Sequence, residues 1–368
     1  LVFIYPGMLK SLNIYGTGRN AIPPRMHHGG AILMPSPWSL GLPCGHQTQH
    51  RQLIMVNGYP SEKMVSLPQN FLHLRSFHNS LGETFMKNYL KNSIVFADGL
   101  DHPECVALHP DGSVWAGGEG GQIYKISNDG TQVNEVANTG GFILGIAFNP
   151  TGDWLIICDL KNHCLWKLDS YSYELGKFSE GADEHKYNIP NYAVFDDAGN
   201  CYVSESGAFR EISGKILKYD TQGNGSVWHN GPFNFANGLA LNHTQDYIFV
   251  VSSWLPGVEK VAISPDGSAG ERSVYCTLPK TVPDGIAFDF EGNLLVSCYT
   301  PNRIFKIAPD QTATVLVDDW EAHTLSNPTN VAFGGPDNDQ LYVSNLGRWH
   351  ILKIEYGQKG MPLASHKR

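Results

Sequence analysis

The sequence contains no long apolar run, and this absence excludes membrane-spanning proteins. No stretch approaches the roughly 18 consecutive apolar residues that a membrane helix needs. The opening LVFIYPG is interrupted by Pro6 and is too short for the core of a signal peptide. We therefore expect no membrane partner and a cytoplasmic location.

Charged residues are also few, at 17% of the chain, and the net charge at pH 7 is −9. A nucleic-acid-binding protein would need a basic stripe, so no nucleic-acid partner is expected. Cysteines number seven, and no CxxC pair occurs among them. Most lie inside apolar runs, where Cys behaves as a small buried hydrophobe, and this favours a reducing compartment. The nucleophile elbow GxSxG is missing too, so a covalent acyl-enzyme is not indicated.

What the chain does contain is a repeat. A short apolar run, a turn rich in Asp, Asn, Pro and Gly, and a second apolar run recur six times. The copies are spaced by about 45 residues, which is typical of β-propeller blades. The first apolar runs start at Val106, Ile146, Ala193, Leu239, Ile286 and Val331.

We therefore predict an all-β fold, a six-bladed β-propeller, over residues 94–362. The segment SIVFADGL, at residues 93–100, is expected to supply the strand that closes the ring with the last blade. Residues 1–93 do not repeat and are expected to form an irregular extension that is poorly ordered or loosely docked. Residues 363–368 are expected to form a C-terminal tail.

One position of the repeat points to chemistry. The first strand of each blade lines the central channel, so residues just before it converge on the propeller axis. That position holds two carboxylates and two side-chain amides, and its six residues are Glu104, Leu144, Asn191, Asn237, Asp284 and Thr329. Two like charges there would repel each other, and one would have to take up a proton. A hard divalent cation such as Ca²⁺ would relieve the repulsion.

Five short motifs give this ring a family resemblance. The elements HPEC (102–105), PN (190–191), ANG (236–238), PDG (283–285) and NPTNVAFGG (327–335) resemble the senescence-marker-protein-30/gluconolactonase family. The resemblance covers about residues 95–362 and includes the ending KGMPL.

The resemblance implies that Glu104, Asn191, Asn237 and Asp284 hold one divalent metal. Ca²⁺ is the expected ion, with Zn²⁺, Mn²⁺ and Mg²⁺ left open. It further implies hydrolysis of lactones or, in some relatives, of organophosphate esters, with Asp284 as general base. Family members that act on aldonolactones often carry an Arg two residues before the first Asn, whereas this chain has Ile189. The resemblance therefore leaves the particular lactone open.

Further candidates come from the loops that follow the second strand of each blade, on the same face as the ring. Glu205 is a second candidate for the base that takes a proton from attacking water. The loops also offer polar and aromatic residues that can contact a small-molecule lactone or ester substrate. These are Asp159, Trp254, Tyr299 and Arg348.

Two other functions stay open on the sequence alone. One is a strictosidine-synthase-like propeller, which condenses an amine with an aldehyde without a metal. The other is a non-catalytic propeller that binds protein partners, because fold alone does not settle function. The oxygen ring argues against both, since neither needs oxygen ligands inside the channel.

Overall fold

The computed structural model describes residues 89–366, and β-strands make up nearly all of its regular structure. These residues form six four-stranded sheets and one two-stranded hairpin. Two short 3₁₀ helices, η3 (Leu346–Arg348) and η4 (Ala364–His366), follow β25 and β26. No helix in this range is long and apolar enough to cross a membrane. The extension predicted for residues 1–93 lies almost entirely outside the described residues.

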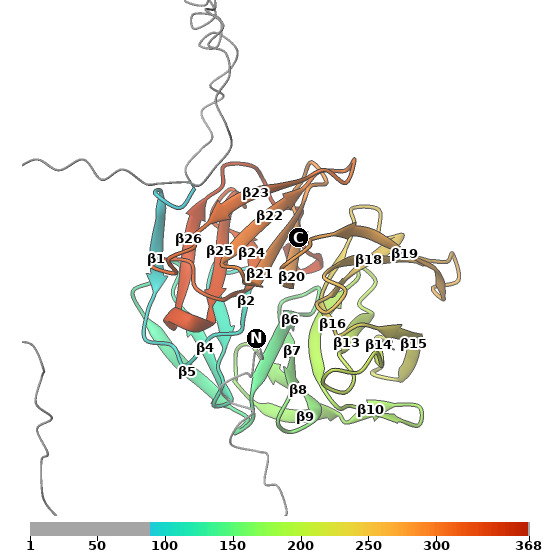
Figure 1. Ribbon diagram of the computed structural model, residues 1–368. Helices are drawn as coiled ribbons and strands as arrows, with labels where there is room; N and C mark the ends of the chain where they lie inside the picture. The colour runs from blue at the N-terminus through green and yellow to red at the C-terminus, as the bar shows by residue number, and fades with distance from the viewer. Residues whose placement is uncertain (1–88, 367–368) are drawn as a thin grey trace, which may run out of the picture. The chain divides into compact units, whose positions relative to one another are not determined.

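The six sheets are the blades of a propeller, which confirms the predicted fold class (Figure 1). Each blade is an antiparallel meander whose first strand is innermost. The strands of blade 1 are β2 (Cys105–Leu108), β3 (Val114–Gly117), β4 (Gln122–Ile126) and β5 (Val133–Asn138). Blade 2 consists of β6 (Ile143–Phe148), β7 (Trp154–Asp159), β8 (Cys164–Asp169) and β9 (Leu175–Ser179). The hairpin of β10 (Gly181–Ala182) and β11 (His185–Lys186) comes next.

The second half of the ring repeats this order. Blade 3 consists of β12 (Pro190–Phe195), β13 (Cys201–Glu205), β14 (Gly214–Tyr219) and β15 (Gly225–Phe233). Blade 4 consists of β16 (Ala236–Leu241), β17 (Tyr247–Ser252), β18 (Gly257–Ile263) and β19 (Ala269–Thr277). Blade 5 consists of β20 (Val282–Phe288), β21 (Leu294–Thr300), β22 (Arg303–Ile307) and β23 (Ala313–Asp318). Blade 6 consists of β24 (Pro328–Gly334), β25 (Gln340–Asn345), β26 (His350–Glu355) and β1 (Ser93–Ala97).

Strand β1 closes the ring, as the sequence predicts. It pairs antiparallel with β26, so that Ser93 lies opposite Ile354 and Val95 opposite Leu352. The last blade is therefore built from both ends of the propeller domain. The innermost strands contact one another in the order β2, β6, β12, β16, β20, β24 and back to β2.

The core lies between the blades, and its side chains follow the taper of the ring. On most innermost strands, one face carries a small residue that packs against two larger residues of the next blade. Ala107 of blade 1, for example, packs in one cluster with Ile146 and Phe148 of blade 2. The same arrangement recurs at Val194, Ala240, Ala287 and Ala332, whereas Ala147 packs with one small and one large residue, Ala193 and Phe195.

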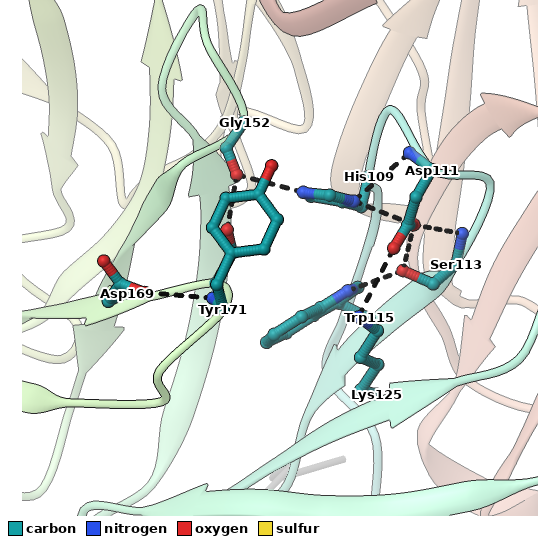
Figure 2. Close-up of polar contacts among 9 residues, drawn as sticks. His109, Asp111, Ser113, Trp115, Lys125, Gly152, Asp169 and Tyr171 are labelled. Carbon is teal, nitrogen blue, oxygen red and sulfur yellow. Dashed lines mark hydrogen bonds and ion pairs between the residues drawn. The ribbon is translucent and has the colours of Figure 1, made fainter.

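A polar network ties the first turn of blade 1 to blade 2 (Figure 2). The buried His109 ring lies between the carbonyl oxygen of Gly152, 3.0 Å from Nε2, and the Asp111 carboxylate, 2.8 Å from Nδ1. The hydroxyl of Ser113 donates to the same carboxylate and accepts a hydrogen bond from the Trp115 indole. These groups satisfy each other, and they lie at the turn beyond the first strand, at the opposite end from the residues of the oxygen ring. Their role is structural.

Candidate metal and active site

The backbone itself turns the ring position toward the channel. In five of the six blades, the pairing of the first and second strands shifts register at this residue. Such β-bulges re-aim a side chain that would otherwise follow the pleat. Asn191 lies in the shift between Pro190 and Tyr192, and Asp284 in the shift between Pro283 and Ile286. In blade 1, Glu104 comes directly before β2.

Glycines let the neighbouring innermost strands approach each other closely at this level. A Cβ on Gly238 would lie 2.6 Å from the carbonyl oxygen of Asp284, and one on Gly285 would lie 2.7 Å from that of Thr329. No side chain fits these positions without moving a backbone. Residues of adjacent blades are thereby brought side by side around the axis.

The two carboxylates of the ring lie in one buried site. Glu104 and Asp284 are 4% and 8% exposed. Burial raises the pKa of Asp284 to about 8, although a hydrogen bond with the Asn237 side chain opposes the shift. Burial, together with the nearby charge of Asp284, holds the pKa of Glu104 well above its usual range. The repulsion that the sequence predicts is therefore present.

Serines that directly follow the second strands hold the two amides. The side-chain NH₂ of Asn191 donates to Ser206 Oγ at 3.1 Å, and that of Asn237 donates to Ser253 Oγ at 3.3 Å. Each serine then donates to a main-chain carbonyl of the next blade. Ser206 bonds to Ala236 O at 2.7 Å, and Ser253 bonds to Pro283 O at 2.8 Å. Because the NH₂ groups are engaged, the amide carbonyl oxygens remain as acceptors.

The same kind of link joins blade 5 to blade 6 and blade 6 to blade 1. Ser297 Oγ donates to the carbonyl oxygen of Thr329 at 3.0 Å, and Ser344 Oγ donates to that of Glu104 at 3.2 Å. The Thr329 side chain also bonds to the Glu104 carboxylate. The sequence analysis missed these four serines, which lie within the second strands or directly after them.

The donor set fits a hard cation. Glu104 Oε1 is buried and has no hydrogen-bond partner within the described residues. Two carboxylates and two amide oxygens match the ligands that Ca²⁺ accepts. The described part of the chain contains no cluster of three or more His, Cys, Asp or Glu residues suited to a metal. A cation here would therefore depend on the amides as well as on the two carboxylates.

The other predicted carboxylates have internal partners. Glu205 is fully buried and accepts hydrogen bonds from the backbone N–H groups of Asn188, Ile189 and Gly207. Asp159 is fully buried and accepts from the Phe142 backbone, from the Asn162 backbone and side chain, and from the Trp166 indole. Both occupy the last place of a second strand and fasten the loops beside it. This placement gives no support to a catalytic Glu205 or to a substrate contact by Asp159.

The predicted wall residues differ in their distance from the ring. Burial raises the pKa of Tyr299 to about 12, and the charges of Glu104 and Asp284 add to this shift. Tyr299 therefore lies near both carboxylates. Arg348 is exposed and donates from Nε to Ala322 O at 2.9 Å, away from the ring residues. The structure therefore brings Tyr299 to the ring and leaves Arg348 at the surface.

Trp254 belongs to an aromatic cluster that the sequence analysis missed. Its ring centroid lies 5.3 Å from that of Phe235 and 5.9 Å from that of Phe209. Phe235 comes two residues before Asn237, and Trp254 directly follows Ser253, so the cluster adjoins the ring. The Trp254 Nε1 atom is buried and has no hydrogen-bond partner within residues 89–366.

A second group lies on the blade 1 side. The negative charge of Glu119 contributes to the raised pKa of Glu104. His102 Nδ1 lies 2.7 Å from Asp101 Oδ1 and 3.5 Å from Glu119 Oε2. The centroid of the His102 ring lies 4.7 Å from that of the half-exposed Trp349, with the two rings tilted by 55°. The Gly-rich context of Glu119 conceals these neighbours in the sequence.

Comparisons with known proteins agree with the fold. A family profile described as the SMP-30/gluconolactonase/LRE-like region matches residues 143–346. A second profile, described as strictosidine synthase-like, N-terminal, matches residues 93–126. A solved structure described as a putative gluconolactonase superposes with a TM-score of 0.64, 19% identity, and coverage of 73% of this chain and 93% of that one. The calcium-binding regucalcin of Agrobacterium tumefaciens superposes with a TM-score of 0.62 and 15% identity, covering 72% and 94%.

Curated relatives match over shorter stretches. The adipocyte plasma membrane-associated protein hemomucin of Drosophila melanogaster is 27% identical over 52% of this chain and 37% of its own length. Regucalcin of Xenopus laevis is 30% identical over 32% of this chain and 40% of its own. A pentonolactonase of Haloferax volcanii is 24% identical over 43% of this chain and 53% of its own. The chain thus spans about two fifths of the length of the first two.

Proposed function

Because the chain belongs to the SMP-30/gluconolactonase/LRE-like family, we propose that it is a divalent-metal-dependent hydrolase that opens lactones. Proteins similar to it are named gluconolactonase and pentonolactonase, which supports lactone chemistry at the level of the family. The substrate would be a small-molecule lactone or related ester.

The observation that carries the proposal is the buried pair of carboxylates. Both Glu104 and Asp284 have raised pKa values, and Glu104 keeps a buried oxygen without a hydrogen bond within residues 89–366. Two buried like charges destabilise the fold unless one of them takes up a proton or a positive charge joins them. A regucalcin structure described as calcium-binding supports Ca²⁺ as the partner ion.

Glu104, Asn191, Asn237 and Asp284 would hold the ion. When bound, a divalent cation polarises a carbonyl group and favours the ionised form of water. We assign the proton of the attacking water to Asp284, the base that the family resemblance implies, since its carboxylate has a second oxygen besides the one that would hold the ion. The water oxygen adds to the lactone carbonyl carbon, the ring C–O bond breaks, and the proton ends on the released hydroxyl group.

Two further groups serve this reaction. The Tyr299 phenol stays protonated at neutral pH, since its pKa is raised to about 12, and it is a neutral donor beside the carboxylates. Ser206 and Ser253 orient the amides and do not take part in proton transfer. We assign no chemistry to Glu205, because its carboxylate already accepts hydrogen bonds from the backbone N–H groups of three residues.

The surroundings of the ring favour an apolar substituent on the substrate. Ile189 is buried where family members acting on aldonolactones often carry Arg. Phe209, Phe235 and Trp254 form the adjoining aromatic cluster, and the Trp254 Nε1 can donate to a substrate oxygen. A lactone with an alkyl or aryl substituent would gain from burial against these rings.

A second candidate is a metal-independent condensation of the strictosidine synthase type. It is favoured by the profile match over residues 93–126, a segment that contains Glu104. It gives no reason for Asp284, Asn191 and Asn237 to share a buried site with Glu104, so we place it second.

One set of measurements tests both. The purified protein is analysed for bound metal, and γ- and δ-lactones with polar and apolar substituents are assayed with and without chelator. Turnover that needs a stoichiometric divalent metal, and that is lost in Glu104→Gln and Asp284→Asn, is the expected result. A metal-free protein inert to every lactone, or one whose turnover survives both substitutions, would remove the proposal.

A further inference from the structure

A cavity occupies the channel below the candidate site, between the innermost strands. It contains about 950 Å³ of empty space, counted together with the part open to solvent. The first strands run from the oxygen ring toward the turns, and the cavity follows their second halves. Residues contributed by all six innermost strands and by the C-terminal residues 361–365 line it.

Most of the lining residues are the Ala, Val, Leu, Ile and Phe residues of the innermost strands, so the wall is largely apolar. Ala147, Val194 and Ala287 are only partly covered and leave space at the axis. Larger neighbours such as Leu241, Phe288 and Phe333 surround the lower part. Cavities with walls of this kind exclude water and accept apolar molecules, because they offer water few hydrogen-bond partners.

The C-terminal segment is anchored where it reaches the cavity. The Phe290 N–H donates to Lys359 O at 2.7 Å, and the Met361 N–H donates to Phe288 O at 3.0 Å. Asn338 holds Gly360 from both sides, by accepting from its N–H and donating to its carbonyl oxygen. Met361, Pro362 and Leu363 are thereby placed in the cavity wall. The segment predicted as a tail begins inside this wall.

A polar crossbar separates the cavity from the oxygen ring. Tyr192 of blade 3 lines the cavity and directly follows Asn191. Its phenol oxygen is hydrogen-bonded to the side chain of Asn330 from blade 6, on the opposite side of the channel. The cavity therefore lies on the far side of this hydrogen bond from the oxygen ring.

We propose that this compartment binds a small apolar molecule, with a medium-length aliphatic chain as its body. From Tyr192 to the level of Phe195 the strand rises about 10 Å, which sets the length that can be buried. His243, exposed at the rim, and Ser365, buried there, offer polar contacts for one hydrogen-bonding end. The chemical class is that of a simple alcohol or acid with one alkyl chain.

Binding is measured with the fluorescent probe N-phenyl-1-naphthylamine and with 1-octanol as competitor, using the full chain. We expect the probe to bind with enhanced fluorescence and 1-octanol to displace it. In the variant Ala147→Leu/Ala287→Leu, which fills the cavity from two opposite blades, we expect affinity to fall at least about tenfold. A protein that binds no probe, or a folded double variant with unchanged affinity, would overturn the proposal.

Two further variants locate the probe. Leu363→Ser, in the wall, should weaken binding, whereas Val315→Ser on β23 should not. Val315 is the matched control for Leu363, because the two residues are almost equally exposed, at 42% and 41%. Asp284→Asn and added chelator should leave binding unchanged, because the crossbar lies between. If Asp284→Asn lost probe binding while Ala147→Leu/Ala287→Leu kept it, the probe would bind at the oxygen ring. That result would refute the cavity site.

Discussion

Replacing Asp284 with Asn should stabilise the metal-free protein at neutral pH, although it removes a proposed metal ligand. Asp284 is buried beside Glu104, and burial raises its pKa from 3.8 to about 8. Asn has nearly the same shape and keeps an oxygen, but it carries no charge at any pH. The substitution therefore isolates the cost of the buried charge.

The sign of the pH dependence follows from the direction of the shift. The folded-state pKa lies above the unfolded value, so the folded state binds the proton more tightly. This contribution to stability is complete below pH 3.8 and is lost as the pH rises to about 8. Four units of pKa at about 1.4 kcal/mol each amount to roughly 6 kcal/mol, nearly all of which is lost by pH 8. Ordinary domains have only about 5–15 kcal/mol in total.

Urea unfolding in the presence of chelator, followed by tryptophan fluorescence, measures this directly. Between pH 4.5 and pH 8 the wild type should lose several kcal/mol relative to Asp284→Asn. The matched control is Glu271→Gln, which removes an exposed carboxylate on β19. Its pH dependence should follow the wild type. Parallel stability curves for wild type and Asp284→Asn would refute the reasoning, because they would show that Asp284 titrates normally in the metal-free fold.

Excess Ca²⁺ should remove about half of the stability difference between the two proteins at pH 8. A ligand that binds only the folded state at one hundred times its Kd adds about 2.7 kcal/mol. The wild type should gain this stabilisation at pH 8, and Asp284→Asn should not. A gain in both proteins would mean that the ion binds elsewhere.

Three further substitutions test the groups around the ring. Ser206→Ala should weaken metal binding about 10- to 100-fold in calorimetry with little effect on folding, because it frees the Asn191 amide to rotate. Gly285→Ala should destabilise the protein by about 1–3 kcal/mol in urea unfolding, since its Cβ would meet a neighbouring backbone. Its control is Gly176→Ala, which has open space around it and should change stability by less than about 0.5 kcal/mol. Glu205→Gln should lower stability by about 1–3 kcal/mol and leave lactone turnover per folded molecule unchanged; a large fall in kcat at unchanged stability would restore Glu205 as a catalytic residue.

The propeller and the ring register could be predicted because the repeat encodes them locally. Each copy contains its own turn residues and its own pair of apolar runs, so the alignment of the copies fixes which residues share a level. The place of Asp284 before Ile286 follows from that alignment alone. The closing strand at 93–97 was predictable for the same reason, because the sixth copy lacks a fourth apolar run of its own.

The contacts of the loops could not be predicted, since their hydrogen-bond partners come from main-chain groups. Whether Glu205 faces substrate or its own backbone depends on the N–H groups of Asn188, Ile189 and Gly207. Every residue has such a group, so sequence letters do not identify these partners. The aromatic cluster around Trp254 likewise needs Phe209 from one blade and Phe235 from another to meet.

The difference between Glu205 and Asp284 explains which buried carboxylates of this fold call for an ion. Glu205 ends a second strand, where several backbone N–H groups donate to its carboxylate and offset part of the cost of burial, although burial still raises its pKa. Asp284 lies in a bulge at the start of a first strand, where its carboxylate forms a hydrogen bond with the Asn237 side chain. Glu104 shares that position in blade 1 and keeps an oxygen without a hydrogen bond. At the ring the backbone supplies too few donors for two charges, and a divalent cation held by four blades supplies what the backbone does not.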